Sequence, residues 1–259
     1  MHPILFKVGF VTIYSYGLMV AVAFLVVTFF LSRKFKEIGL RGDLAFDLAI
    51  YLLVFGIIGA RLLHVFLNLD YYLNNLKEIF MLWHGGLAWQ GGFLFALAGG
   101  ILFMKRNNLK IGATCDIIIP YVVLGQAIGR IGCFLNGCCF GVPTDFALGM
   151  VFPGRTGPIH PTQLYNCFFL VVIFIILKKM EKKKTFDWQI FSLYLILHSI
   201  MRFNIDFIRG DLQAAFFGLT ISQLISIGLF LTGLSLYLMK SGLTQGSERK
   251  PADVIVKNE

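Results

Sequence analysis

Residues 129–141 read Gly-Arg-Ile-Gly-Cys-Phe-Leu-Asn-Gly-Cys-Cys-Phe-Gly and follow a long apolar run that begins near Cys115. Arg130 therefore places a permanent positive charge at or inside one face of a lipid bilayer, where charge is costly and usually serves a function. The glycines and Asn136 predict a break in the helix at this point. Irregular backbone at membrane depth is tolerated only against protein or a water-filled cavity, so the stretch predicts the wall of a polar site.

Composition excludes an ordinary soluble domain. Of the 259 residues, 57% are hydrophobic and only 14% are charged, which is typical of a polytopic membrane protein. The formal net charge of +9 is a feature of nucleic-acid-binding proteins as well. Here, however, the basic residues collect in short loops between apolar runs, so membrane topology explains the charge and we expect no nucleic-acid partner.

Seven apolar runs are long enough to cross a bilayer, for which an α-helix needs about 20 residues. They cover residues 11–31, 44–67, 87–104, 115–135, 161–177, 188–208 and 219–239. We therefore predict an all-α polytopic membrane protein with about seven transmembrane helices and with its two termini on opposite sides.

The loops predict the orientation. Sixteen Lys and Arg residues lie in one set of loops and four in the other, which places the N-terminus outside and the C-terminus in the cytoplasm. We expect one integral membrane domain over residues 1–240, with outer-face segments near 69–90 and 137–160. Residues 241–259 are polar and predict a cytoplasmic tail.

Three arginines lie within the apolar runs and need a partner or an anionic ligand: Arg61, Arg130 and Arg202. Asp206 and Arg209 follow Arg202 at i+4 and i+7, which predicts one shared helical face. One interpretation is a local ion pair between Arg202 and Asp206. The other is a guanidinium cluster for a lipid phosphate, because a planar guanidinium matches phosphate oxygens.

Arg61 and Tyr16 are open to two interpretations each. Arg61 is expected either to pair with Asp47 or Asp116 or to contact a ligand. Tyr16 lies at the outer start of the first run, where a tyrosine is either an interfacial anchor or part of a site.

Two histidines lie in the outer segments, His84 and His160. Either residue titrates near neutrality and is able to act as a base, although a hydrogen-bonding role is the simpler interpretation. Gln90, six residues after His84, has no titratable proton.

The five cysteines, at positions 115, 133, 138, 139 and 167, lack the paired Cys-x-x-Cys spacing of a zinc site. Small apolar residues in helices are their simplest interpretation. We therefore predict no metal and no cofactor.

Taken together, several segments resemble the prolipoprotein diacylglyceryl transferases. The segments are residues 16–19, 59–61, 83–92, 129–137, 160–165 and 202–209. They occur in the order of that family and cover most of the chain.

The resemblance implies transfer of the diacylglyceryl group of phosphatidylglycerol to the lipobox cysteine thiol of a preprolipoprotein, the first step of bacterial lipoprotein maturation. It implies a multi-pass protein of the bacterial plasma (inner) membrane whose active site faces outward. Arg130 and Arg202 are by similarity the lipid-phosphate and catalytic arginines, and Tyr16 and Asp206 are positioning groups. The substrate-binding residues that we expect are Arg130, Arg61, Gln90, Asn136, His160, Gln163 and Arg209.

The chain departs from the family's pattern at several positions. Cys133 and Cys138 stand where the family has an asparagine and a glutamate, and Gln90 stands where it has a histidine. Asn166 and Asp206 each replace a glutamate. Because the usual base is missing, His84 becomes the candidate acceptor of the thiol proton.

Two other functions remain open. A related membrane transferase that uses the same lipid on a different acceptor would account for Gln90 and the cysteines. A non-enzymatic lipid or solute transporter would account for the buried arginines and the apolar runs.

If His84 is the base, His84→Gln lowers turnover about a hundredfold or more at neutral pH, because a neutral imidazole with a pKa near 6.5 accepts a thiol proton there. Much of the loss is recovered at high pH, where the thiol ionises unaided. Initial rates of peptide modification measured across pH test this. An unchanged rate and pH profile would reject the assignment.

Overall fold

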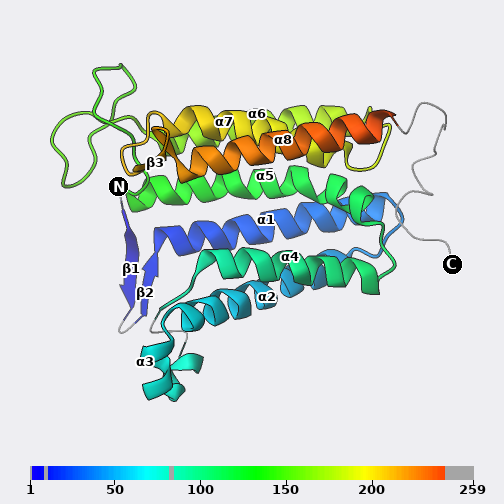
Figure 1. Cartoon of the computed structure of the whole chain (residues 1–259), viewed down its shortest axis with the longest axis horizontal. Helices are drawn as coiled ribbons and strands as arrows, with labels where there is room; N and C mark the ends of the chain where they lie inside the picture. Colours follow the sequence, from blue (N-terminus) through cyan, green and yellow to red (C-terminus); the bar gives the residue numbers. More distant parts are fainter. Residues whose placement is uncertain (1, 9–10, 82–84, 243–259) are drawn as a thin grey trace. The chain divides into compact units, whose positions relative to one another are not determined.

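The computed structural model describes residues 2–8, 11–81 and 85–242 (Figure 1). Contacts divide the chain into two compact units. Unit 1 comprises the described residues of Met1–Phe30 and Cys115–Lys250, and unit 2 comprises those of Leu31–Thr114. Helices α1 (Ser15–Glu37) and α5 (Ile111–Asn136) run from one unit into the other.

Each predicted apolar run contains one long helix. The other five are α2 (Asp43–Leu67), α4 (Trp89–Arg106), α6 (Thr162–Glu181), α7 (Gln189–Asp206) and α8 (Ile221–Gly242). Among the described residues, five helices are long and apolar enough to cross a membrane, namely α1, α2, α5, α6 and α8. The chain is therefore a largely helical, multi-pass membrane protein, whereas membrane crossing by α4 and α7 stays a prediction.

The start of the first predicted helix is wrong. Residues Val11–Tyr14 form strand β2, which pairs antiparallel with β1 (Ile4–Val8). Branched and aromatic residues such as Thr12, Ile13 and Tyr14 favour extended backbone. Helix α1 begins at Ser15, whose N–H donates to the carbonyl of Pro3 at 2.9 Å. A second hairpin, β3 (Ala214–Phe216) and β4 (Leu219–Thr220), precedes α8.

The core of unit 1 lies between α5, α6 and α7. Apolar side chains three or four residues apart form one face of each helix. The buried members are Ile119, Val123 and Ala127 on α5, Leu170, Ile173 and Leu177 on α6, and Ile190, Tyr194, Leu195, Met201 and Ile205 on α7. Helix α1 meets α5 at two glycines seven residues apart, where an added Cβ would lie 2.8 Å from Val27 at Gly125 and 3.0 Å from Met19 at Gly132.

Asp116 fastens the start of α7 to α5. Its buried carboxylate accepts the N–H groups of Trp188 and Phe191, each at 2.8 Å, and lies 2.9 Å from Lys184 Nζ. A carboxylate at a helix N-terminus satisfies otherwise unpaired N–H groups and is favoured by the helix dipole. Asp116 is therefore committed to α7 and to Lys184.

Unit 2 is built on close contact between α2 and α4. A Cβ added at Gly91 would overlap the carbonyl of Gly59 and lie 2.5 Å from Leu63 Cβ. Small residues let helix backbones approach closely, which is how helices associate in a bilayer. In the sequence, α2 and α4 are separated by α3 (Leu69–Asn74) and the 3₁₀ helix η1 (Leu76–Phe80).

Gly91→Ala is expected to destabilise the protein by about 1–3 kcal/mol, because overpacking forces two helix backbones apart. Thermal unfolding in detergent, followed by circular dichroism, measures the effect. Gly228→Ala in α8 is the matched control, since no heavy atom lies within 4 Å of the added Cβ. Equal melting temperatures for the two variants would contradict the packing.

Candidate functional site

The end of α5, the start of α6 and the end of α7 lie at the same end of unit 1 (Figure 1). Most of the site residues expected in this unit lie on or near these helix ends. The segment that follows α5 is tied to both neighbours by backbone hydrogen bonds. Gly141 N–H donates to the His160 carbonyl at 2.9 Å, and Val142 N–H donates to the Ile208 carbonyl at 3.0 Å. The break predicted after Asn136 is thus held against protein.

Two fully buried side chains at the start of α6 hold the same segment. Thr162 Oγ1 donates to the carbonyl of Cys139 at 2.6 Å, and Gln163 Nε2 donates to the carbonyl of Cys138 at 2.5 Å. Gln163, expected to bind substrate, therefore has its amide nitrogen engaged by backbone. Its Oε1 is buried and has no hydrogen-bond partner among the described residues.

Arg202 is only partly satisfied. Its Nε donates to Ser222 Oγ on α8 at 2.9 Å, and its NH2 lies 3.2 Å from Asp206 Oδ1. This distance confirms the predicted local ion pair between Arg202 and Asp206, and the Asp206 carboxylate is fully buried. Arg202 NH1 is also buried but has no hydrogen-bond partner in the described chain. The sequence offered no signal for Ser222, which lies 20 residues away.

The prediction that Arg209 shares a helical face with Arg202 and Asp206 is wrong, because α7 ends at Asp206. Arg209 instead forms a bidentate pair with Asp211, at 2.8 Å from Nε to Oδ1 and 2.5 Å from NH2 to Oδ2. Burial opposes ionisation of Asp211, but the hydrogen bonds from Arg209 outweigh it and lower the pKa of that carboxyl. The spacing of two residues was the available signal for this pair.

Arg130 is half-buried on α5 and forms no hydrogen bond or ion pair with any described residue. Its positive charge is near enough to repel that of Arg202, and the positive charge of Arg209 also repels that of Arg202. Tyr16 lies next to Gly132, two residues after Arg130, since a Cβ added at Gly132 would lie 3.4 Å from Tyr16 Cδ2. The tyrosine remains 46% exposed.

The charges around Arg130 do not balance. Two aspartates are paired with Arg202 and Arg209, and the third guanidinium remains without a counterion in the described chain. One net positive charge near membrane depth is thus available to an anion.

Other expected site residues have structural partners. His160 lies 3.2 Å from the Tyr165 hydroxyl through Nδ1. Asn136 is the last residue of α5, and its side chain lies near the thiol of Cys138. Asn166 Nδ2 donates to the carbonyl of Thr162 at 2.8 Å within α6.

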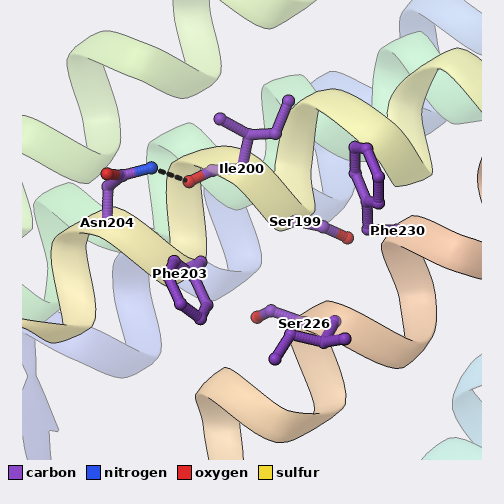
Figure 2. A pocket seen from close by; sticks show the side chains of 7 residues that line it. Ser199, Ile200, Phe203, Asn204, Ser226 and Phe230 are labelled. Carbon is purple, nitrogen blue, oxygen red and sulfur yellow. Dashed lines mark hydrogen bonds between the residues drawn. The ribbon is translucent and has the colours of Figure 1, made fainter. Parts of the chain in front are cut away.

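An apolar groove of about 210 Å³ lies between α7 and α8 (Figure 2). It is lined by Ser199, Ile200, Phe203, Asn204, Ser226, Ile227 and Phe230. Each polar lining residue donates to a carbonyl of its own helix, at 2.5 Å for Ser199, 2.7 Å for Asn204 and 2.8 Å for Ser226. The groove therefore presents mainly hydrocarbon.

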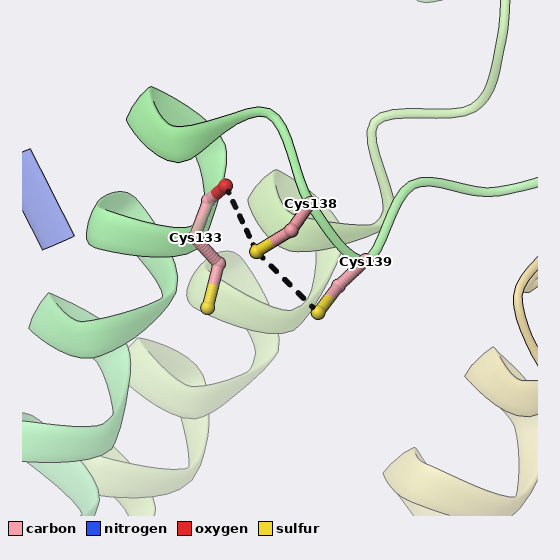
Figure 3. A group of neighbouring side chains, drawn as sticks. All are labelled: Cys133, Cys138 and Cys139. Carbon is pink, nitrogen blue, oxygen red and sulfur yellow. Dashed lines mark hydrogen bonds between the residues drawn. The ribbon is translucent and has the colours of Figure 1, made fainter. Parts of the chain in front are cut away.

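Three thiols converge at the end of α5 (Figure 3). The Sγ atoms of Cys133, Cys138 and Cys139 all lie within 4.8 Å of one another. Burial raises the pKa of Cys138, and the neighbouring Cys133 thiol, followed by burial, raises the pKa of Cys139. Sequence spacing did not reveal this cluster, because it depends on how the chain turns after Asn136.

In unit 2, Arg61 organises a loop. Its five N–H donors reach five backbone carbonyls: those of Ile79 at 2.9 Å, Gly85 at 2.6 Å, Gly86 at 2.9 Å, Met81 at 3.3 Å, and Glu78. An arginine has five such donors, so none is left for a ligand. The expected carboxylate partners, Asp47 and Asp116, are replaced by backbone.

Gln90 is exposed at the start of α4 in unit 2. His84 lies outside the described residues, so its role stays a prediction.

Comparisons with known proteins agree on one family. The family model described as prolipoprotein diacylglyceryl transferase matches residues 3–239. Proteins named phosphatidylglycerol–prolipoprotein diacylglyceryl transferase are similar to this chain. That of Clostridium tetani is 31% identical, covering 92% of this chain and 97% of its own. That of Staphylococcus haemolyticus is 34% identical, covering 99% and 94%, respectively.

Arg61→Lys is expected to loosen the loop that the guanidinium holds, because an ammonium has three donors and no planar fork. Amide hydrogen exchange of residues 76–81 and 85–86 should become faster by at least about tenfold, equivalent to one or two lost hydrogen bonds. Arg106→Lys is the control, since among the described residues this exposed arginine donates one hydrogen bond, to the Tyr51 hydroxyl at 3.3 Å. Unchanged exchange would contradict the structural role of Arg61.

Proposed function

Because the chain belongs to the prolipoprotein diacylglyceryl transferase family, we infer that it transfers the diacylglyceryl group of phosphatidylglycerol to the lipobox cysteine of preprolipoproteins. It is a membrane transferase of lipoprotein biosynthesis. The similarity extends over more than nine tenths of the chain and of the two relatives named above.

The observation that supports the site is the unmatched positive charge around Arg130. The phosphodiester of phosphatidylglycerol carries one negative charge, which neutralises the surplus. Arg130 has its donors available, and Arg202 NH1 is buried without a partner among the described residues. Guanidinium groups bind phosphate oxygens through two parallel hydrogen bonds.

The reaction needs two kinds of help. The substrate thiolate attacks the glyceryl carbon, and the bond from that carbon to the phosphate oxygen breaks, which releases glycerol phosphate with additional negative charge. Arg130 and Arg202 stabilise this charge as it develops. Asp206 positions Arg202 through the buried ion pair, and Tyr16 lies at the same site beside Gly132.

The groove between α7 and α8 suits an acyl chain of the lipid (Figure 2). Its lining is mainly hydrocarbon, and its residue Phe203 directly follows Arg202 in α7. A lipid with its phosphate at the arginines would therefore extend a chain along this groove. Binding energy from such remote contacts helps to orient the reacting carbon.

The proposed topology has seven spans, with α4 and α7 crossing in addition to the five apolar helices. The distribution of Lys and Arg supports an outer N-terminus and a cytoplasmic C-terminus. The gathered ends of α5, α6 and α7 then face the outer side of the bacterial plasma membrane. Lipobox cysteines emerge on that side after export.

Gln90 and His84 complete the proposal in unit 2. Gln90 is assigned to substrate binding through its amide, and His84 is assigned to accepting the thiol proton. Arg61 contributes by holding the backbone carbonyls of Glu78, Ile79, Met81, Gly85 and Gly86.

Purified protein incubated with phosphatidylglycerol and a lipobox peptide should yield a thioether-linked diacylglyceryl peptide, detected by mass spectrometry. Arg130→Ala should lower the rate about a hundredfold or more, because one preorganised partner of the leaving phosphate is lost. Arg130→Lys should retain part of the rate, since charge remains without the bidentate geometry.

Arg41→Ala is the control for these variants, because Arg41 is exposed and lies 4.0 Å from exposed Asp43. Normal activity in well-expressed Arg130→Ala would remove Arg130 from the site. Phospholipid turnover without peptide modification would indicate a different acceptor, and the absence of both reactions would favour a transporter.

A further inference from the structure

The three thiols of Cys133, Cys138 and Cys139 are brought together by the backbone conformation after α5. Cys133 lies in the last turns of α5, and Gly137 at φ +75° and Cys139 at φ +62° reverse the chain behind it. A non-glycine residue rarely adopts the left-handed conformation of Cys139, at a cost of about 1 kcal/mol or more. This reversal brings the thiols of Cys138 and Cys139 back toward Cys133.

Buried hydrogen bonds hold the reversed segment. Thr162 and Gln163 are fully buried. Their side chains cannot move without losing the hydrogen bonds that they donate to the carbonyls of Cys139 and Cys138. The segment is thus fixed on both sides of the Cys138–Cys139 peptide. Local strain persists only where such surroundings enforce it.

The spacing of the sulfur atoms fits a thiophilic metal ion. With Zn–S bonds of about 2.3 Å, tetrahedral geometry places neighbouring sulfur atoms about 3.8 Å apart. The Sγ atoms of Cys138 and Cys139 already lie 3.7 Å apart. All three lie within 4.8 Å, so a shift of about an ångström completes the arrangement.

The reaction also lacks an evident base among the described residues of unit 1's site. Asp206 and Asp211 are paired with arginines, and the ring of His160 is hydrogen-bonded to Tyr165. An unperturbed thiol with a pKa of about 8.5 is only a few per cent ionised at neutral pH. A metal ion that coordinates the thiol removes this limit, because a coordinated thiol is deprotonated.

We propose that Cys133, Cys138 and Cys139 bind a zinc ion whose fourth position takes the lipobox cysteine of the substrate. The proposal rests on the proposed function, since it assigns the activation of that reaction's nucleophile. Three protein ligands with one open position are the pattern of catalytic zinc, whereas structural zinc sites are closed by four. Arg130 lies three residues before Cys133 on α5, so the phosphate and thiol sites are neighbours.

The step balances without a redox reagent. The substrate thiol loses its proton to solvent as its sulfur binds Zn²⁺. A sulfur electron pair then forms the bond to the glyceryl carbon, and the electron pair of the breaking carbon–oxygen bond leaves with the phosphate. Zinc stays divalent, and the thioether product, a weak ligand, dissociates.

Metal content of the purified full-length protein tests the site directly. Wild type, prepared with reductant and supplied with Zn²⁺, should retain about one equivalent after gel filtration. Cys133→Ser, Cys138→Ser and Cys139→Ser should each retain about a tenth or less. The control is the double variant Cys115→Ser/Cys167→Ser, whose cysteines lie outside the cluster, and it should match wild type. Circular dichroism confirms that every variant is folded.

Co²⁺ in place of Zn²⁺ reports on the fourth position without any turnover. A lipobox peptide should increase the thiolate-to-cobalt absorption by about a third, as a fourth thiolate joins three. The same peptide with serine in place of cysteine should leave the spectrum unchanged. Removing zinc should then lower thioether formation at pH 7 about thirtyfold, the factor expected from an un-ionised thiol, and added Zn²⁺ should restore it.

The outcomes separate this inference from the proposed function. The inference would be overturned if folded wild type retains no zinc or if the cobalt spectrum does not change when the cysteine peptide is added. It would also be overturned if two cluster cysteines form a disulfide in protein prepared with reductant. Thioether formation at an unchanged rate without metal would overturn it while the transferase function stands. A cobalt response to the peptide without any thioether product would support the thiol site and reject the transferase reaction.

Discussion

A guanidinium in a low-dielectric environment is stable only when acceptors surround it, and this requirement organises both units. Arg61 meets it completely, with five donors on five carbonyls. Arg209 meets it through Asp211, whereas Arg202 meets it only in part, through Asp206 and Ser222. Arg130 does not meet it within the described chain. Arg61 therefore has all its donors bound to backbone carbonyls, whereas Arg130 has donors available for an anion.

Residues expected to touch substrate instead hold the backbone that carries the site. Gln163 binds the carbonyl of Cys138 in the turn after α5, and Arg61 binds backbone carbonyls of residues 78–81 and 85–86. Such residues lie close to functional groups in the sequence, so a motif does not separate the two roles. Burial and hydrogen-bond partners do separate them, because a donor fully engaged by carbonyls has nothing left for a ligand.

The sequence predicted the helices well and their chemistry unevenly. Runs of about 20 apolar residues leave a chain in lipid few options besides a helix, so each long helix of the described residues overlaps one predicted run. The missed features depend on local detail or on distant contacts. Strand β2 replaced a helical start because residues 11–14 favour extended backbone, and α7 ended before Arg209. Ser222 and the cysteine cluster were invisible, because contacts over 20 residues and a left-handed Cys139 leave no periodic signal.

The spacing of Arg130 and Cys133 links the two halves of the reaction. Residues at i and i+3 lie on one helical face, with Cβ atoms about 5–6 Å apart. A displacement at carbon requires the nucleophile about 3–3.5 Å from the reacting atom and the leaving group on its other side. A phosphate site at Arg130 and a thiolate site at Cys133 would therefore confine the reacting carbon between them. Gly132, placed between the two residues, lets Tyr16 and Met19 pack against α5 there. The stretch that ends α5 thus brings together a guanidinium without a counterion in the described chain, three clustered thiols and the close helix contact at Gly132.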